Sequence, residues 1–179
     1  MVTAALMDNL ILLGRGDLAN TVAKQVPSAR RKHLINLHLD GGRVICWLPT
    51  VQDPVDQQVQ SVVAAIDQAQ TKPAKIVVWS PAGTADDATP TQLAKWWGKD
   101  WRQIWSAYLY MVKMIDELEY PYTVVRSLPL AAHGPQGVLY REGEPIKGQT
   151  VAIQDVAKTV VSACQGKWPN ESIGVGARI

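Results

Sequence analysis

The fold of this chain follows from one segment, Asn9-Leu-Ile-Leu-Leu-Gly14-Arg-Gly16-Asp-Leu-Ala19-Asn-Thr-Val-Ala-Lys24. Its first part, from Leu10 to Leu13, is a continuous apolar run that predicts a strand buried on both faces. Two glycines then indicate a tight turn, and the following residues predict a helix that extends to about Val26. Pro27 ends this helix, because proline cannot continue it. The segment therefore predicts a strand, a turn and a helix in immediate succession.

The turn has the small-residue pattern G-x-G-x-x-A, formed by Gly14, Gly16 and Ala19. In a dinucleotide-binding turn, the first glycine permits the bend and the second lets a diphosphate approach bare backbone. The third small residue lets helix and strand pack closely, and the helix amides face the anion. The same pattern also suits a purely structural turn, so the motif alone leaves both interpretations open.

Asp17 complicates the anion-binding interpretation, because its carboxylate would share the helix N-terminus with a diphosphate. Repulsion between two solvated anions costs about 1 kcal/mol. Either Arg15 offsets this charge, or Asp17 simply caps the helix. We place Arg15, Asp17 and Leu18 in the predicted cofactor-binding turn together with the two glycines.

Beyond the turn, apolar strand-like runs alternate with segments of helical periodicity. Strands are predicted at 34–39, 43–48, 75–80, 122–126 and 172–175, and helices at 53–70, 91–118 and from 154 onward. This alternation is typical of a doubly wound parallel α/β sheet, the Rossmann-like class. We expect one domain over residues 1–179, with a leader at 1–8 and a shortened unit after the first helix. A loop at 127–150, with a short extended piece at 138–140, is expected to contact the substrate.

Composition argues against several classes of protein. Of the 179 residues, 47% are hydrophobic and 19% are charged, and the net charge is +2. This balance argues against nucleic-acid binding, and the one basic cluster, Arg30-Arg31-Lys32, is expected before the strand at 34–39. No apolar run reaches the ~18 residues of a membrane span, and no basic cleavable leader is evident, so we expect a cytoplasmic protein. Cys46 and Cys164 lack metal-binding spacing and are expected to be buried free thiols, and no metal site is predicted.

Ligands of doubly wound sheets bind beyond the carboxyl ends of the strands. Besides the glycine turn, this rule selects Asp40, Pro49, Ser80 and the loop that follows Arg126. Asp40 would accept hydrogen bonds from the adenosine ribose and favour NAD, or would form an ordinary Asp-Gly turn. Arg43 or the basic cluster would instead favour a 2′-phosphate. The cofactor is therefore expected to be NAD or NADP, with the preference open.

Several of these segments occur together in one known family: Gly14-x-Gly16, Ser80-Pro-Ala-Gly83, Lys113-x-x-x-Glu117, Tyr122-Thr-Val-Val-Arg126-Ser-Leu-Pro129 and Ile153-Gln-Asp155-Val-Ala157. In combination they resemble the atypical short-chain dehydrogenase/reductase family over most of the chain. This family includes the NmrA-like, flavin-reductase-like and biliverdin-reductase-B-like NAD(P)-binding proteins. The resemblance implies that Ser80 and the loop after Arg126 border the nicotinamide and substrate. It also implies that Lys113 corresponds to the lysine of the family's long helix.

Two departures from the family pattern bear on function. The turn is one residue shorter than the family's G-x-x-G-x-x-G, and the Tyr-x-x-x-Lys acid/base pair is absent, because Leu109 stands four residues before Lys113. We therefore expect the cofactor to carry the chemistry, with hydride passing from the nicotinamide to a small planar acceptor such as a flavin or quinone. The alternatives are a non-catalytic redox sensor that acts on a partner protein, and a scaffold that has lost the cofactor.

Ser80, Lys113 and His133 are the candidate catalytic residues. Ser80 would hold the nicotinamide amide or polarise the substrate, or it would only end its strand. Lys113 would hold ribose hydroxyls, or it is an ordinary exposed helix lysine. His133 would donate a proton during hydride transfer, or it is a surface histidine without a role.

Trp97, Trp101 and Trp105 recur at helical spacing along the predicted helix 91–118 and form one stripe. Aromatic residues are enriched at subunit contacts, so the stripe predicts a homodimer joined through this helix. The alternative is that the stripe packs in the core.

Overall fold

A seven-stranded sheet, ordered β2-β1-β3-β4-β5-β9-β7, forms the centre of the computed structural model, which describes residues 7–179. Most of the predicted leader, residues 1–6, lies outside the described residues. The strands of the sheet are β1 (Leu10–Leu13), β2 (Arg30–Lys32), β3 (Val44–Trp47), β4 (Lys75–Pro81), β5 (Tyr122–Ser127), β7 (Gly137–Tyr140) and β9 (Glu171–Ala177). All pairs are parallel except β7 with β9, and a separate parallel pair joins β6 (Leu130–Ala131) to β8 (Val151–Ala152).

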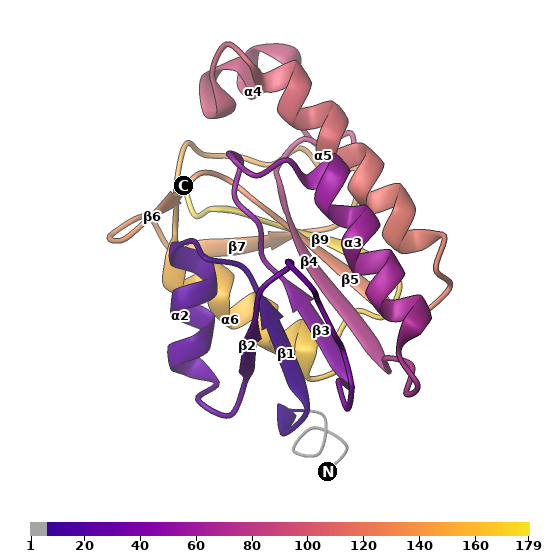
Figure 1. Ribbon diagram of the computed structural model, residues 1–179. Helices are drawn as coiled ribbons and strands as arrows, with labels where there is room; N and C mark the ends of the chain where they lie inside the picture. The colour runs from indigo at the N-terminus through magenta and orange to yellow at the C-terminus, as the bar shows by residue number, and fades with distance from the viewer. Residues whose placement is uncertain (1–6) are drawn as a thin grey trace.

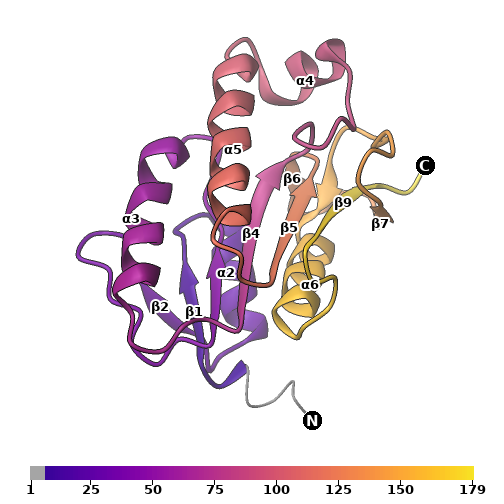
Figure 2. The same ribbon diagram turned by 90° about the vertical axis from the view of Figure 1, so that its right-hand side faces the viewer.

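Helices cover both faces of the sheet, as the sequence predicts. They are α2 (Asp17–Gln25), α3 (Val55–Gln68), α4 (Pro90–Trp97), α5 (Trp101–Asp116) and α6 (Ile153–Cys164). Helices α2 and α6 lie against one another on one face, while α3 and α5 pack together on the other (Figures 1 and 2). Strands β1, β3 and β4 are buried at every position, because both of their faces are covered. The doubly wound parallel fold is therefore confirmed.

The strand predicted at 34–39 is wrong, and the true second strand is the basic cluster. Residues Arg30–Lys32 form β2, which pairs in parallel with β1 through Ile11↔Arg30 and Leu13↔Lys32. Such an edge strand has little apolar surface to bury, so its three polar residues carry no hydrophobic pattern. Residues 33–43 contain no helix and return directly to β3, with Asn36 in the left-handed region at φ +54°. The predicted shortening after the first helix is the loss of this connecting helix.

The single helix predicted at 91–118 is also wrong, because Gly98 divides it in two. Gly98 ends α4 with φ +85°, a conformation that L side chains rarely adopt, and α5 begins three residues later at Trp101. A capping box between Thr89 and Gln92 starts α4. Trp97 therefore does not share one continuous helix with Trp101 and Trp105.

The extended piece predicted at 138–140 is present as β7. It pairs with β9 at the edge of the sheet, through Val138↔Gly176 and Tyr140↔Gly174. At the beginning of the predicted 127–150 loop, Pro129 and Leu130 line a cavity at the carboxyl edge, where ligands bind in such sheets. Cys46 and Cys164 are free and buried, as expected.

The buried Lys75 at the start of β4 gives a testable pH dependence. Its Nζ donates to the carbonyl of Lys167 at 2.8 Å, and burial lowers the pKa of Lys75 to about 8. The unfolded lysine keeps its proton up to a pKa of ~10.4, so the unfolded chain binds more protons between about pH 8 and 10. In this window, stability relative to a Lys75→Met variant is expected to rise with pH, as measured by urea unfolding.

The change of this stability difference with pH is the quantity that tests the prediction. Loss of the hydrogen bond to the Lys167 carbonyl alone would lower the stability of the variant by the same amount at every pH. Burial raises the pKa of Tyr122 to about 12, so its ionisation affects stability only above the window. A constant stability difference between the two proteins across the window would contradict the prediction.

Candidate functional site

The turn after β1 is held open as bare backbone. Gly14 has φ +134°, and a Cβ at this position would overlap the carbonyl oxygen of Leu48. At Gly16 an added Cβ would lie 2.6 Å from the Thr50 methyl carbon. The turn therefore packs directly against the end of β3, and neither glycine can carry a side chain without displacing it.

Hydrogen bonds from both sides fix this turn. Arg31 donates to the Gly14 carbonyl at 2.8 Å and to the Asn20 amide oxygen at 2.9 Å. On the β3 side, the Thr50 amide donates to Asp53 at 2.7 Å, and the Thr50 carbonyl accepts from the buried Tyr108 hydroxyl at 2.8 Å. Burial raises the pKa of Tyr108 above its usual range, so its hydroxyl stays protonated.

The N-terminus of α2 begins at this turn and faces the carboxyl edge of the sheet. Gly16 is its N-cap, and no side chain caps the helix. Asp17 is exposed, so of the two sequence-based alternatives, capping of α2 by Asp17 is not what the structure shows. Uncapped amides at a helix N-terminus are a favourable place for an anion.

A basic cavity of about 410 Å³ lies on the β2 side of the turn. It is lined by Gly14, Arg15, Gly16, Lys32, His33, Leu34, Ile35, Trp47, Pro49, Thr50, Asp53 and Gln58. Its charged wall comes from Arg15 in the turn and from Lys32 at the end of β2, and Arg15 Nη2 lies 3.0 Å from Nδ1 of the neighbouring His33. The cavity therefore combines exposed backbone with positive charge.

A tryptophan cavity of about 330 Å³ lies on the other side of Gly16 and shares Gly16, Pro49 and Thr50 with the basic cavity. It is lined by Gly16, Asp17, Leu18, Leu48, Pro49, Thr50, Val51, Gln52, Trp79, Trp96, Trp97, Pro129 and Leu130. Each indole N–H is bonded inside the protein: Trp79 to Ser127 Oγ, Trp96 to the Gly148 carbonyl and Trp97 to the Ala82 carbonyl. These bonds hold the rings in place as flat apolar walls.

The structure brings six of the predicted cofactor-binding residues together around these two cavities. They are Gly14, Arg15, Gly16, Asp17, Leu18 and Pro49. The rule that places ligands beyond the carboxyl ends of parallel strands accounts for this grouping, since all six follow β1 or β3.

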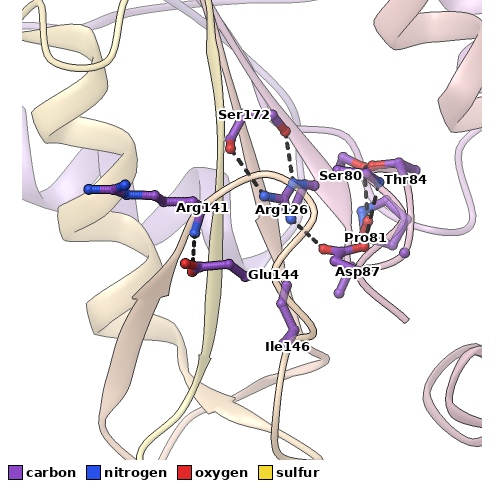
Figure 3. Close-up of polar contacts among 12 residues, drawn as sticks. Ser80, Pro81, Thr84, Asp87, Arg126, Arg141, Glu144, Ile146 and Ser172 are labelled. Carbon is purple, nitrogen blue, oxygen red and sulfur yellow. Dashed lines mark hydrogen bonds and ion pairs between the residues drawn. The ribbon is translucent and has the colours of Figure 1, made fainter. Parts of the chain in front are cut away.

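Ser80 and Arg126 lie at the correct edge of the sheet but are fully buried and engaged within the protein (Figure 3). The Ser80 hydroxyl donates to the Pro81 carbonyl at 2.9 Å and lies 2.8 Å from the Thr84 hydroxyl. Arg126 forms an ion pair with Asp87 and donates to the side chain and carbonyl of Ser172. Neither residue lines the two cavities, because their side chains point into the protein.

Asp40, Lys113 and His133 lie away from both cavities. Asp40 precedes β3 rather than ending a strand. It lies at the opposite edge of the sheet, where the amide of nearby Arg43 donates to the Asn9 carbonyl. Lys113 is on the last turn of α5, where the chain approaches the start of β5, and its exposed side chain lies 3.9 Å from Glu117. His133 is exposed between β6 and β7. The prediction for Asp40 depended on the strand at 34–39, which does not form.

Sequence reasoning missed His33, Thr50, Gln58, Trp79 and Trp96 as cavity residues, and it considered Lys32 only within the basic cluster that would favour a 2′-phosphate. His33 was missed because the second strand was placed too late in the chain. The sequence offered one signal for Thr50 and Trp79, which is their position. Thr50 directly follows Pro49 and Trp79 directly precedes Ser80, and both Pro49 and Ser80 were predicted to lie near the ligand because they end strands.

Comparison with known proteins shows the family. The NAD(P)H-binding protein family matches residues 31–167, which is most of the chain and does not include the glycine turn. No curated protein matches the sequence significantly. Within residues 7–179, no helix has the length and apolar character needed to cross a membrane.

Solved structures with the same fold cover 94% of this chain. A short-chain dehydrogenase/reductase from Veillonella parvula DSM 2008 in complex with NADP is 16% identical, with a TM-score of 0.71 over 94% of its own chain. A Rossmann-fold NAD(P)-binding family protein from Shigella flexneri is 16% identical, with a TM-score of 0.68 over 93% of its chain. An oxidoreductase from Lactococcus lactis is 14% identical, with a TM-score of 0.64 over 91% of its chain. At these identities the likeness establishes the fold.

The residues of the turn fit a dinucleotide, because Gly14 and Gly16 present bare backbone to a cavity that adjoins a helix N-terminus without a side-chain cap. This fit is independent of the family match, which begins after the turn. The chain therefore belongs to the NAD(P)H-binding protein family and has a Rossmann fold, and its cofactor is NAD or NADP.

Proposed function

We propose that this protein is an NADPH-dependent oxidoreductase that reduces a small planar acceptor such as a flavin or quinone. The observation that carries the proposal is the tryptophan cavity, which adjoins the glycine turn and has flat aromatic walls. The adenosine end of the cofactor is assigned to the basic cavity, the diphosphate to Gly16 and the N-terminus of α2, and the nicotinamide end to the tryptophan cavity. Arg15 offsets the negative charge of the exposed Asp17.

The chemistry of the tryptophan cavity favours a conjugated acceptor. A bound reduced nicotinamide supplies a hydride. Among the described residues that line this cavity, Asp17 is the one with a titratable side chain, and it is exposed. Reduction of an isolated carbonyl needs a positioned proton donor for the alkoxide, whereas a flavin or quinone delocalises the added electrons and takes its proton from water. The Trp97 ring, which meets Trp79 edge to face at 80°, would stack on a planar acceptor and exclude water from one of its faces.

Oxidation of NADPH by different acceptors tests this function. We expect steady consumption of NADPH with a flavin or a quinone, and about 100-fold slower turnover, or none, with simple aldehydes and ketones. A Trp97→Ala variant should lose most of the quinone or flavin activity, because one wall of the cavity is removed. Faster turnover of a simple ketone than of any planar acceptor would contradict the proposal.

The second candidate is a non-catalytic redox sensor that binds the dinucleotide. The missing Tyr-x-x-x-Lys pair and the distance of Lys113 from the cavities favour it. Binding of NADPH without oxidation by any acceptor would select this candidate.

The basic cavity supports a preference for NADP over NAD. The residue that follows β2 distinguishes the two cofactors in Rossmann folds, with a carboxylate for the NAD ribose and a cation for the 2′-phosphate. Here Lys32 ends β2 and His33 follows it, and both line the basic cavity, whereas Asp40 is elsewhere. Asp53 lines the cavity, but its carboxylate accepts hydrogen bonds from the Thr50 amide and hydroxyl.

Reversing the charge at Lys32 should therefore remove this preference. Lys32→Glu is expected to weaken NADPH binding about 10- to 100-fold while NADH binding changes by less than about threefold, as measured by calorimetric titration. Lys158→Glu makes the same charge change on α6 and lines neither cavity, so it serves as the matched control. Equal losses for NADPH and NADH in Lys32→Glu would contradict the assignment.

A homodimer and a cytoplasmic location remain predictions. The indole of Trp105 donates to the Gly83 carbonyl and Trp101 is buried, so the tryptophan stripe is partly used within the chain. Sedimentation analysis tests the dimer directly. The two free buried thiols fit a reducing compartment, which supports the cytoplasm.

A further inference from the structure

The two cavities on either side of Gly16 differ in charge. Among the described residues that line the tryptophan cavity, Asp17 carries the only charge, and its side chain is exposed. Arg15 and Lys32 line the basic cavity alone, and Arg15 Nη2 lies 3.0 Å from His33 Nδ1 on that side of the turn. The phosphates of the cofactor therefore meet cations, whereas an acceptor in the tryptophan cavity meets a carboxylate.

Most hydrogen-bond donors around the tryptophan cavity are already used within the protein. All three of its indole N–H groups donate to internal acceptors. Thr50 donates both its amide and its hydroxyl to Asp53, and Pro49 and Pro129 have no amide proton. Among the described lining side chains, this leaves the amide of the exposed Gln52 as a donor. An anion that entered the cavity would lose its hydration and gain few hydrogen bonds in return.

We propose that Asp17 makes the tryptophan cavity selective for uncharged planar acceptors and against acceptors that carry a carboxylate, sulfonate or phosphate on or beside the ring. This inference rests on the proposed function, which places the acceptor in this cavity. Repulsion by Asp17 and the shortage of donors act in the same direction, since both disfavour an anion. The apolar faces of the tryptophan rings bind an uncharged ring without either penalty.

The test compares two ligands of nearly the same shape, anthraquinone sulfonamide, which is uncharged, and anthraquinone sulfonate, substituted at the same carbon. Each is titrated calorimetrically into the protein saturated with tetrahydro-NADPH, a reduced analogue whose uncharged ring cannot give up a hydride. The measurement therefore reports equilibrium affinity without turnover. The wild-type protein is expected to bind the sulfonamide about 10-fold more tightly than the sulfonate at low salt. This preference should weaken as the salt concentration rises to about 0.5 M, because salt screens an exposed carboxylate.

Asp17→Asn removes the charge and keeps the shape of the side chain. Because the Asp17 side chain does not cap α2, and Thr21 bonds to the backbone carbonyl of residue 17, the variant should fold normally. The ratio of the two affinities is expected to fall to about threefold or less. Both affinities are measured in the same variant, so a change in cofactor binding affects them alike. Asp67→Asn removes the same charge from an exposed position near the end of α3 that lines neither cavity, and it should keep the wild-type ratio.

The outcomes separate this inference from the proposed function. Equal affinities for the two ligands in the wild-type protein, or an unchanged ratio in Asp17→Asn, would overturn the role of Asp17 while the proposed function stands. A preference that does not change with salt would also overturn it, because rejection by shape alone is insensitive to screening. Failure of both ligands to bind the complex with tetrahydro-NADPH would overturn the inference and the proposed function together.

Discussion

Arg126→Met should destabilise the protein by about 3–5 kcal/mol or prevent folding altogether, because it breaks a buried ion pair from one side. Both Arg126 and Asp87 are fully buried, and Figure 3 shows the guanidinium directed at the carboxylate. Removing the arginine leaves the Asp87 carboxylate unpaired in the interior, and it also removes the donors to Ser172. Urea unfolding monitored by circular dichroism measures the loss.

A double variant separates the cost of the orphaned charge from the cost of lost packing. Apolar replacement of both partners of a buried pair is often far milder than removal of one, so Arg126→Met with Asp87→Leu should recover much of the stability lost in the single variant. A loss of less than about 1 kcal/mol in Arg126→Met alone would contradict this account of the pair.

This ion pair also holds a segment that leads to the candidate site. Asp87 lies in the segment between β4 and α4, and its carbonyl accepts from the Ile146 amide at 2.9 Å. The same segment leads into Trp96 and Trp97, which wall the tryptophan cavity. We therefore expect Arg126 to affect the site through the position of this segment rather than by contact with a cofactor.

Gly16→Ala should weaken NADPH binding by about 100-fold or more, because a Cβ at this position occupies the bare backbone that the diphosphate approaches. The same Cβ would lie 2.6 Å from the Thr50 methyl carbon, so the single variant also strains the turn. Calorimetric titration measures the affinity, and thermal unfolding checks the fold.

Thr50→Ser separates these two effects. It removes the methyl group but keeps the hydroxyl that donates to Asp53 and accepts from the Gln52 amide. Gly16→Ala combined with Thr50→Ser should therefore fold normally and still fail to bind, while Thr50→Ser alone binds as wild type. Equal affinity in the double variant and in Thr50→Ser would place the diphosphate elsewhere.

The sheet could be predicted from the sequence because its central strands are buried on both faces. Leu10–Leu13 and Lys75–Pro81 carry a nearly unbroken apolar signal, and in both cases a turn or loop follows at the ligand-binding edge. The glycine turn was predictable for the same reason, since Gly14 and Gly16 follow the first of these strands directly. Local sequence determined these features.

The features that failed depend on tertiary context. The edge strand Arg30–Lys32 needs only backbone pairing with β1, and this leaves no apolar pattern to detect. Gly98 breaks the long helix although the tryptophan spacing continues through it, because spacing alone does not report a residue at positive φ. Both errors affected residues of the site: the first hid His33, and the second assigned Trp97 to the same helical stripe as Trp101 and Trp105.

Side-chain direction was the other limit on the candidate site. Ser80 and Arg126 end their strands at the correct edge, yet both side chains turn inward and are fully buried. Strand position predicts which edge a residue reaches, while the packing of β9 and of the 82–89 segment determines which way its side chain points. Gln58 could not be selected because a glutamine on an amphipathic helix is ordinary until its surroundings are known.

Titration of the wild-type protein with NADPH, followed by tryptophan fluorescence, tests the central claim most directly. Trp79, Trp96 and Trp97 line the cavity assigned to the nicotinamide, so saturable quenching of their emission is expected, with tighter binding of NADPH than of NADH. No saturable change with either nucleotide at concentrations up to the millimolar range would contradict the assignment of the glycine turn and its two cavities as the cofactor site.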